Sequence, residues 1–186
     1  ILNTKIASDS AIQTNEKNYN FFKEGIEVDV QNENGSYVKR KVQLFDFNHP
    51  EENDFLAVQE MKIWGEVYHR RADIVGFVNG IPLLFVELKR DDIPVENAYN
   101  DNYKDYQTTI PQLFYYNAFI MFANGPEAKV GTLGAKFKFF HEWKRLSEDD
   151  EEGSVAFETM LLGMCNKKNF MDLFENFILF DHSNGK

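Results

Sequence analysis

Three charged side chains stand at the ends of apolar runs, at a spacing that suits metal-assisted hydrolysis. Asp73 opens the run 73–78 (DIVGFV), and Glu87 and Lys89 close the run 82–89 (PLLFVELK). Side chains alternate along a strand, so Glu87 and Lys89 share one face. An unpaired carboxylate is costly to bury beside so much apolar sequence, and this context favours a functional role.

Whether Asp73 meets Glu87 depends on the connection between the two runs, Asn79-Gly80-Ile81. A strict two-residue turn would pair Asp73 with Val86 and place the two carboxylates on opposite faces of the hairpin. A three-residue loop, or a bulge, places Asp73 directly opposite Glu87, with Cβ atoms roughly 4.5–5.5 Å apart. Gly80 makes either feasible. The hypothesis therefore requires the longer loop or a bulge.

Two carboxylates at this separation repel each other unless a cation lies between them. Mg²⁺, or Mn²⁺ in its place, suits Asp73, Glu87 and the backbone carbonyl of Leu88 as ligands, together with water and a substrate phosphate. Such an ion polarises a phosphate and lowers the pKa of a bound water. Lys89 is placed to orient that water or to stabilise the developing charge. The structural alternative is a strand whose polar end reaches solvent, with Glu87 paired to Lys89 or Arg71.

The strands and helices that must position these residues can be predicted from the pattern of apolar residues. That pattern predicts one α/β domain over residues 1–186, with a central mixed sheet flanked by helices and an N-terminal hairpin. Alternating apolar residues around the turn 32–35 indicate the hairpin. Strands are expected at 56–64, 73–78, 82–89 and 118–123, and helices at 95–107, 155–165 and 167–180. Residues 1–25 are expected to be helical or irregular, and 148–153 to form an acidic, exposed turn.

The composition excludes several classes of protein. Hydrophobic residues make up 43% of the chain, which is too many for a disordered protein. No apolar run approaches the roughly 20 residues that span a bilayer. The single cysteine, Cys165, allows no internal disulfide and fits a reducing cytosol. A net charge of −10 argues against broad nucleic-acid binding, so the isolated chain is expected to bind DNA weakly.

Two further motifs are absent. The four histidines lack the spacing of a zinc site. The segment 131–136 lacks the spacing of a phosphate-binding loop, which argues against ATP binding within this chain.

Several spaced motifs resemble the N-terminal nuclease domain of the R (restriction and translocation) subunit of type I restriction enzymes, a nuclease of the PD-(D/E)xK type. The similar segments are 70–75, 77–83 and 86–89, with 42–47, 53–58, 110–114, 116–117, 124–125, 142–144 and 175–180 in the same order. The resemblance covers about Tyr19 to the C-terminus, and it implies a restriction-endonuclease-like core.

The resemblance also implies an activity. Asp73, Glu87 and Lys89 would be the metal-binding and catalytic residues of Mg²⁺-dependent cleavage of duplex DNA, in defence against foreign DNA. ATP would act only in motor domains beyond residue 186, because the chain is expected to be a fragment. Methylation and specificity subunits would be partners, in a bacterial or archaeal cytoplasm. The alternative is an inert nuclease-like module that docks partner subunits.

The chain departs from the family pattern at two places. Ala72 stands where the motif has proline, a conformational aid rather than a chemical group. The family's Gln-x-x-x-Tyr motif is matched by Asn102 and Tyr106, which share a helix face at i and i+4. Asn hydrogen-bonds as Gln does but reaches less far. Tyr106 is therefore the stronger candidate of the two.

Overall fold

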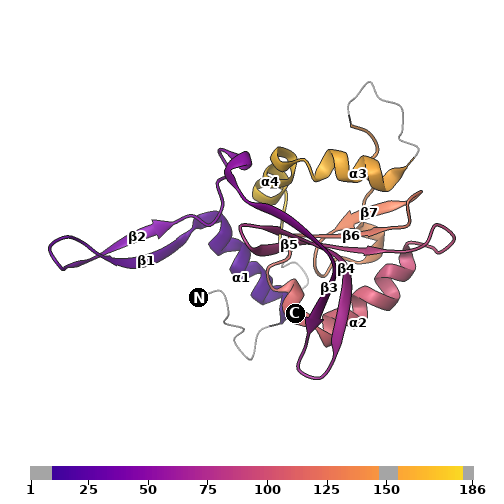
Figure 1. Ribbon diagram of the computed structural model, residues 1–186, viewed down its shortest axis with the longest axis horizontal. Coiled ribbons are helices and arrows are strands. Elements are labelled where there is room, and N and C mark those ends of the chain that lie inside the picture. Colours follow the sequence, from indigo (N-terminus) through magenta and orange to yellow (C-terminus); the bar gives the residue numbers. More distant parts are fainter. Residues whose placement is uncertain (1–9, 147–154, 182–186) are drawn as a thin grey trace.

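A five-stranded mixed sheet, in the order β3-β4-β5-β6-β7, forms the centre of the molecule (Figure 1). The computed structural model describes residues 10–146 and 155–181. The strands are β3 (Phe55–Trp64), β4 (His69–Val78), β5 (Ile81–Leu88), β6 (Phe119–Ala123) and β7 (Ala128–Gly131). Strands β5 and β6 pair in parallel, and the other neighbours are antiparallel. The predicted α/β class with a mixed sheet is confirmed.

Helices cover both faces of this sheet. Helices α1 (Ala11–Glu24), α3 (Ala156–Met164) and α4 (Lys167–Asn176) share one hydrophobic core with it. The π-helix η2 (Ala98–Tyr103) and the helix α2 (Lys104–Thr109) share a second core with the opposite face. Short 3₁₀ turns complete the described elements: η1 (Pro50–Glu52), η3 (Pro111–Phe114) and η4 (Phe137–Phe139). In Figure 1, α3 and α4 accordingly lie on one side of the strands and α2 on the other.

The two central strands are apolar at odd and even positions because each of their faces meets a core. All five residues of β6 are buried, and β5 is buried from Leu83 to Glu87. Val86 belongs to the core beneath α3 and α4, whereas Phe85 belongs to the core beneath α2. A charged residue near the end of β5 therefore enters the protein interior.

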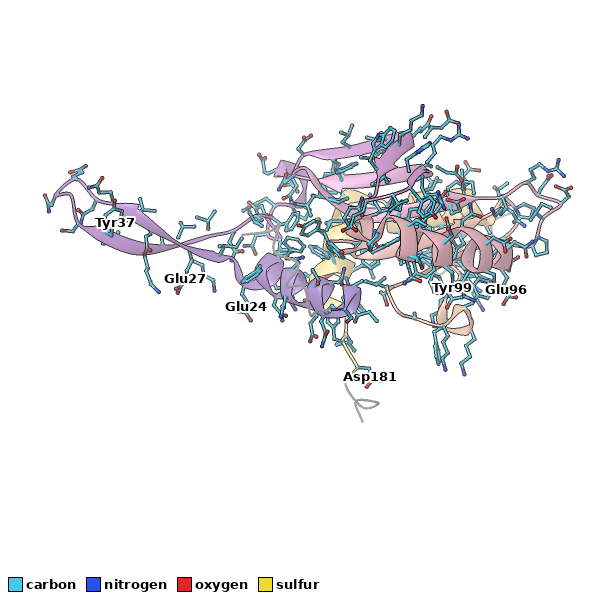
Figure 2. All side chains as sticks on the ribbon, turned by 90° about the horizontal axis from the view of Figure 1, so that it is seen from below. Glu24, Glu27, Tyr37, Glu96, Tyr99 and Asp181 are labelled. Carbon is cyan, nitrogen blue, oxygen red and sulfur yellow. The ribbon has the colours of Figure 1, made fainter. Side chains whose placement is uncertain are left out.

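The predicted N-terminal hairpin is an arm that projects from the body (Figures 1 and 2). It consists of β1 (Ile26–Gln31) and β2 (Tyr37–Val42), and most of its side chains are exposed. Figure 2 shows Glu27 along the arm and Tyr37 near its tip. Lys39 Nζ lies 3.3 Å from Glu27 Oε2, in a cross-strand ion pair.

The β4–β5 hairpin combines a two-residue turn with a bulge. Val78 pairs with Ile81, so the turn is Asn79-Gly80, and both residues have positive φ, at 49° and 79°. This is the type I′ pattern that suits tight hairpins. The register then shifts, because Gly76 pairs with Leu84 while Phe77 pairs with Pro82. Of the two routes left open by the sequence, the structure uses the bulge rather than the longer loop.

Several boundaries differ from the prediction. Strand β4 begins at His69, so Asp73 lies inside the strand and does not open it. The helix expected at 95–107 begins with the π-helix at Ala98 and continues to Thr109, because Pro94 and Val95 are used in preceding turns. Strand β7 was not anticipated. The acidic turn expected at 148–153 lies outside the described residues, and within the described ones no helix is long and apolar enough to cross a bilayer.

Candidate active site

The bulge in β5 brings the two predicted acids together. Ile74 pairs with Val86, so Asp73 and Glu87 are the next residues along their strands and lie across from each other. The Asp73 carboxylate is fixed there, since its Oδ2 accepts a hydrogen bond from the backbone N–H of Leu88 at 2.8 Å. An unbulged two-residue hairpin would instead have placed Val86 opposite Asp73 and turned Glu87 to the other face.

Glu87 is a buried carboxyl group that lacks a full set of partners. Its residue is 3% exposed, and its Oε2 has no hydrogen-bond partner among the described residues. Burial, and secondarily the charge of Asp73, raises the pKa of Glu87 to about 8. Lys89 and Arg71 act in the opposite direction without cancelling this shift. A cation is the partner that such a pair of acids favours.

Lys89 follows β5 and lies beside Glu87. Its Nζ is 3.9 Å from Glu87 Oε1, and it donates a hydrogen bond to Asn102 Oδ1 at 2.5 Å. The Lys89 side chain is 20% exposed, so the ammonium is held at the edge of the site rather than extended into solvent. The ion pair of Glu87 with Lys89, raised as the structural alternative, is present but leaves Glu87 Oε2 free.

Both residues of the variant helix motif reach this group. The Asn102 side chain accepts a hydrogen bond from Lys89, and Tyr106 lies four residues further along the helix. The Tyr106 hydroxyl donates to the backbone carbonyl of Arg71 at 2.9 Å. Burial, and then the charge of Glu87, raises the pKa of Tyr106. Sequence reasoning ranked Asn102 below Tyr106 because Asn is short, and it missed the contact with Lys89.

A π-turn precedes Tyr106 in the helix that carries this motif. The backbone N–H of Lys104 bonds to the carbonyl of Tyr99, five residues earlier, and Asn102 lies within this wider turn. Such turns are frequent at functional sites. The motif residues of the sequence therefore straddle a change of helix type, which their i, i+4 spacing alone does not reveal.

The basic residues before Asp73 have separate roles in the structure. The His69 ring packs on the Trp64 ring, with centroids 4.8 Å apart. Arg70 is hydrogen-bonded to Asp105, and Arg71 is ion-paired to Glu60. The basic run 39–41 lies on β2, in the arm that projects away from the central sheet (Figure 1).

Glu60, an acid on the neighbouring strand β3, does not join the pair. Glu60 directs its carboxylate to Arg71 Nη1 at 3.2 Å. Across residues 10–146 and 155–181, no group of three or more His, Cys, Asp or Glu side chains is arranged to hold a metal ion. Within the described residues, the acids that meet at this point of the sheet are therefore Asp73 and Glu87.

Comparison with known proteins shows which family this chain resembles. A family model described as the N terminus of the type I restriction enzyme R protein matches residues 2–139. The HindI endonuclease subunit of a type I restriction enzyme from Haemophilus influenzae is 31% identical over 186 residues, which cover 96% of this chain. The putative MjaIXP endonuclease subunit from Methanocaldococcus jannaschii is 27% identical over 188 residues, covering 88% of this chain.

The chain spans only part of these relatives. It covers 17% of the Haemophilus influenzae subunit and 18% of the Methanocaldococcus jannaschii one. A second subunit from that archaeon, the putative MjaVIIIP endonuclease subunit, is 24% identical and is covered to 15%. The similarity therefore concerns a segment of much longer proteins.

Proposed function

This chain belongs to the family of type I restriction enzyme R protein N-termini, and from that membership we propose that it cleaves DNA. The reaction is metal-dependent hydrolysis of phosphodiester bonds in duplex DNA at Asp73, Glu87 and Lys89. One observation carries the proposal. A buried carboxylate with a free oxygen, Glu87, lies across from a second acid and beside an ammonium. Such an arrangement is unfavourable for the fold alone and suits a cation-binding site.

The donor set fits Mg²⁺, with Mn²⁺ as a substitute. Glu87 Oε2 is buried without a hydrogen-bond partner among the described residues, and the Asp73 carboxylate accepts a hydrogen bond from the backbone N–H of Leu88. Hard oxygen ligands of this kind, few in number, leave room for water and a substrate phosphate. The backbone carbonyl of Leu88 is the third proposed ligand. When bound, the ion would polarise the phosphate and increase the acidity of a water.

Lys89, Asn102 and Tyr106 have the remaining proposed roles, which are to stabilise charge and to hold other groups in position. Lys89 holds an ammonium beside Glu87, where it orients a water or neutralises charge on the phosphate. Asn102 fixes that ammonium, because its Oδ1 accepts a hydrogen bond from Lys89 Nζ at 2.5 Å. Tyr106 anchors the helix to β4 by donating a hydrogen bond to the Arg71 carbonyl. Lys89 is thus a proposed catalytic residue, and Asn102 and Tyr106 are positioning residues.

The larger protein is part of the proposal. The relatives are named as endonuclease subunits of type I restriction enzymes and are more than five times longer than the matched segment. We propose that this chain acts within such a subunit, with ATP-dependent motor domains outside residues 1–186. Methylation and specificity subunits would recognise the DNA sequence, which agrees with a nuclease segment whose own net charge is −10.

The test is cleavage of plasmid DNA with Mg²⁺, first by the chain and then by the full-length subunit assembled with its partners. Asp73→Asn, Glu87→Gln and Lys89→Met keep side-chain size, and each is expected to abolish cleavage. Glu27→Gln, at an exposed acid on the arm, is the matched control and should cleave normally. Circular dichroism establishes that the variants are folded. Normal cleavage by all three site variants would show that the site is assigned wrongly.

An inert docking module is the competing function, and the arm is the observation that favours it. Val30, Tyr37, Val38 and Val42 are exposed on β1 and β2, as residues that contact a protein partner often are. Calorimetry with Mg²⁺ or Mn²⁺, with and without DNA, separates the two. Binding that disappears in Asp73→Asn supports the nuclease, and absence of any such binding supports the docking module.

A further inference from the structure

Two adjacent arginines on β4 precede Asp73, and they are held very differently. Arg70 donates through Nε and Nη2 to both oxygens of Asp105, and its guanidinium lies over the Tyr68 ring. Its side chain is 28% exposed. Arg71 meets Glu60 through Nη1 at 3.2 Å, and its side chain is 56% exposed. Arg70 is therefore fixed in the fold, whereas Arg71 is accessible at the site.

Glu60, the partner of Arg71, is held in an unfavourable backbone conformation. Its φ is +51° within β3, in the left-handed region that residues other than glycine rarely adopt. The register of β3 and β4 places it across from Asp73, where the ladder of paired residues is interrupted. Backbone strain of this kind gathers at ligand-binding and switch positions. Glu60, the strained residue, thus lies beside the proposed active site, and its carboxylate is ion-paired with Arg71.

We propose that Arg71 contacts a backbone phosphate of the DNA near the scissile bond, and that Glu60 is ion-paired with the Arg71 guanidinium until DNA binds. This inference rests on the proposed nuclease function and deepens it. Arg71 lies two residues from Asp73 on the same strand, and it is near enough to Glu87 to influence it electrostatically. A phosphate reaching those acids therefore passes within range of this guanidinium. Arg71 touches the substrate, and Glu60 is a positioning residue that acts through Arg71.

Replacement of Glu60 by a DNA phosphate as the partner of the Arg71 guanidinium is energetically favourable. The Glu60 side chain is 67% exposed, and ion pairs between exposed side chains contribute little. A guanidinium–phosphate contact can be bidentate and charge-assisted, which makes it the stronger of the two. Release of Glu60 also costs no buried charge, because its carboxylate returns to water.

The experiment measures DNA binding and cleavage by the full-length subunit. Binding of a fluorescent duplex is followed in Ca²⁺, and cleavage in Mg²⁺ gives KM and kcat. Arg71→Ala is expected to raise Kd and KM about tenfold and to lower the slope of log affinity against log salt by about 1, with kcat little changed. Glu60→Gln is expected to lower Kd and KM severalfold. Lys39→Ala and Glu27→Gln, at two residues that form an exposed ion pair at 3.3 Å on the arm, are the matched controls.

A double-mutant cycle separates this role from a simple change of net charge. In the Arg71→Ala background, Glu60→Gln should give no further gain in affinity, since it acts by freeing Arg71. An equal gain with and without Arg71 overturns the inference. Glu60→Gly removes both the charge and the backbone strain. It should match Glu60→Gln in Kd while melting at a higher temperature, which shows that the gain in binding does not come from the strain.

The outcomes for this inference and for the proposed function are distinct. Unchanged Kd, KM and salt slope in Arg71→Ala overturn the inference while cleavage by the unsubstituted protein upholds the nuclease. Binding that depends on Arg71, without any Mg²⁺-dependent cleavage, overturns the nuclease and retains the phosphate contact. Absence of DNA binding by the unsubstituted protein overturns both.

Discussion

Raising the pH should destabilise this chain through Glu87 when no divalent cation is present. The pKa of Glu87 rises from its ordinary value of 4.5 to about 8 in the folded chain, chiefly through burial and then through the charge of Asp73. Below pH 4.5 the carboxyl is protonated in both the folded and the unfolded chain. Between pH 4.5 and 8 the unfolded chain loses the proton while the folded chain keeps it. The free energy of unfolding therefore falls across this window and is level above it.

The loss amounts to about 5 kcal/mol, since each pH unit of the window corresponds to about 1.4 kcal/mol. Glu87→Gln keeps the shape of the side chain and cannot ionise, so it should not show this loss. Urea unfolding in EDTA, from pH 4.5 to 9, gives the difference between the two proteins. Other acids with lowered pKa values, such as Asp46 and Asp105, are common to both proteins and cancel. The free energy of unfolding of Glu87→Gln, relative to that of the original chain, should rise steadily up to about pH 8.

Mg²⁺ should reverse the effect, because the ion binds the ionised form of Glu87. Binding of the metal releases the Glu87 proton, so Mg²⁺ affinity should rise with pH up to about 8. At pH 8–9 the ion should stabilise the original chain and leave Glu87→Gln nearly unchanged. A difference between the two proteins that stays flat from pH 4.5 to 9 in EDTA would refute the reasoning, since Glu87 would then be hydrated rather than buried.

Three further predictions concern single residues. Asn102→Ala removes the acceptor for Lys89 Nζ and should lower kcat about tenfold with little change in KM, as measured by plasmid cleavage. Gly65→Ala would place a Cβ 2.1 Å from the backbone oxygen of Thr109, and it should cost about 1–3 kcal/mol in urea unfolding. Burial raises the pKa of the Cys165 thiol to about 11, so iodoacetamide at pH 8 should alkylate it about a hundredfold more slowly in the folded than in the unfolded chain.

The sequence predicted the central sheet because its signals are local. The runs that became β5 and β6 are apolar at odd and even positions, which indicates strands covered on both faces. Asn79-Gly80 similarly specifies the tight turn, since both residues adopt the positive φ that a type I′ turn requires. The start of β4 was missed because residues 69–72 are mostly polar, and their strand character comes from pairing with β3.

The pairing of the two acids needed information that is not local. A type I′ turn alone would have separated Asp73 from Glu87, and the sequence left the bulge and the longer loop open. The bulge is selected by packing. Leu83 is the extra residue between the pairs that flank the shift, and it is completely buried in the core beneath α3 and α4. The burial of an apolar side chain on one face thus sets the position of a carboxylate on the other.

This coupling has a consequence for how the site is maintained. Deep burial of Leu83 stabilises the bulged register by a few kcal/mol, since a fully buried large apolar side chain contributes about 1.5–3 kcal/mol. That gain is comparable with the cost of keeping Glu87 buried above neutral pH. The free energy gained by apolar burial on the α3 and α4 side therefore offsets the cost of the buried acid on the α2 side. Truncation of Leu83 should release Glu87 from its place across from Asp73 before the rest of the sheet unfolds.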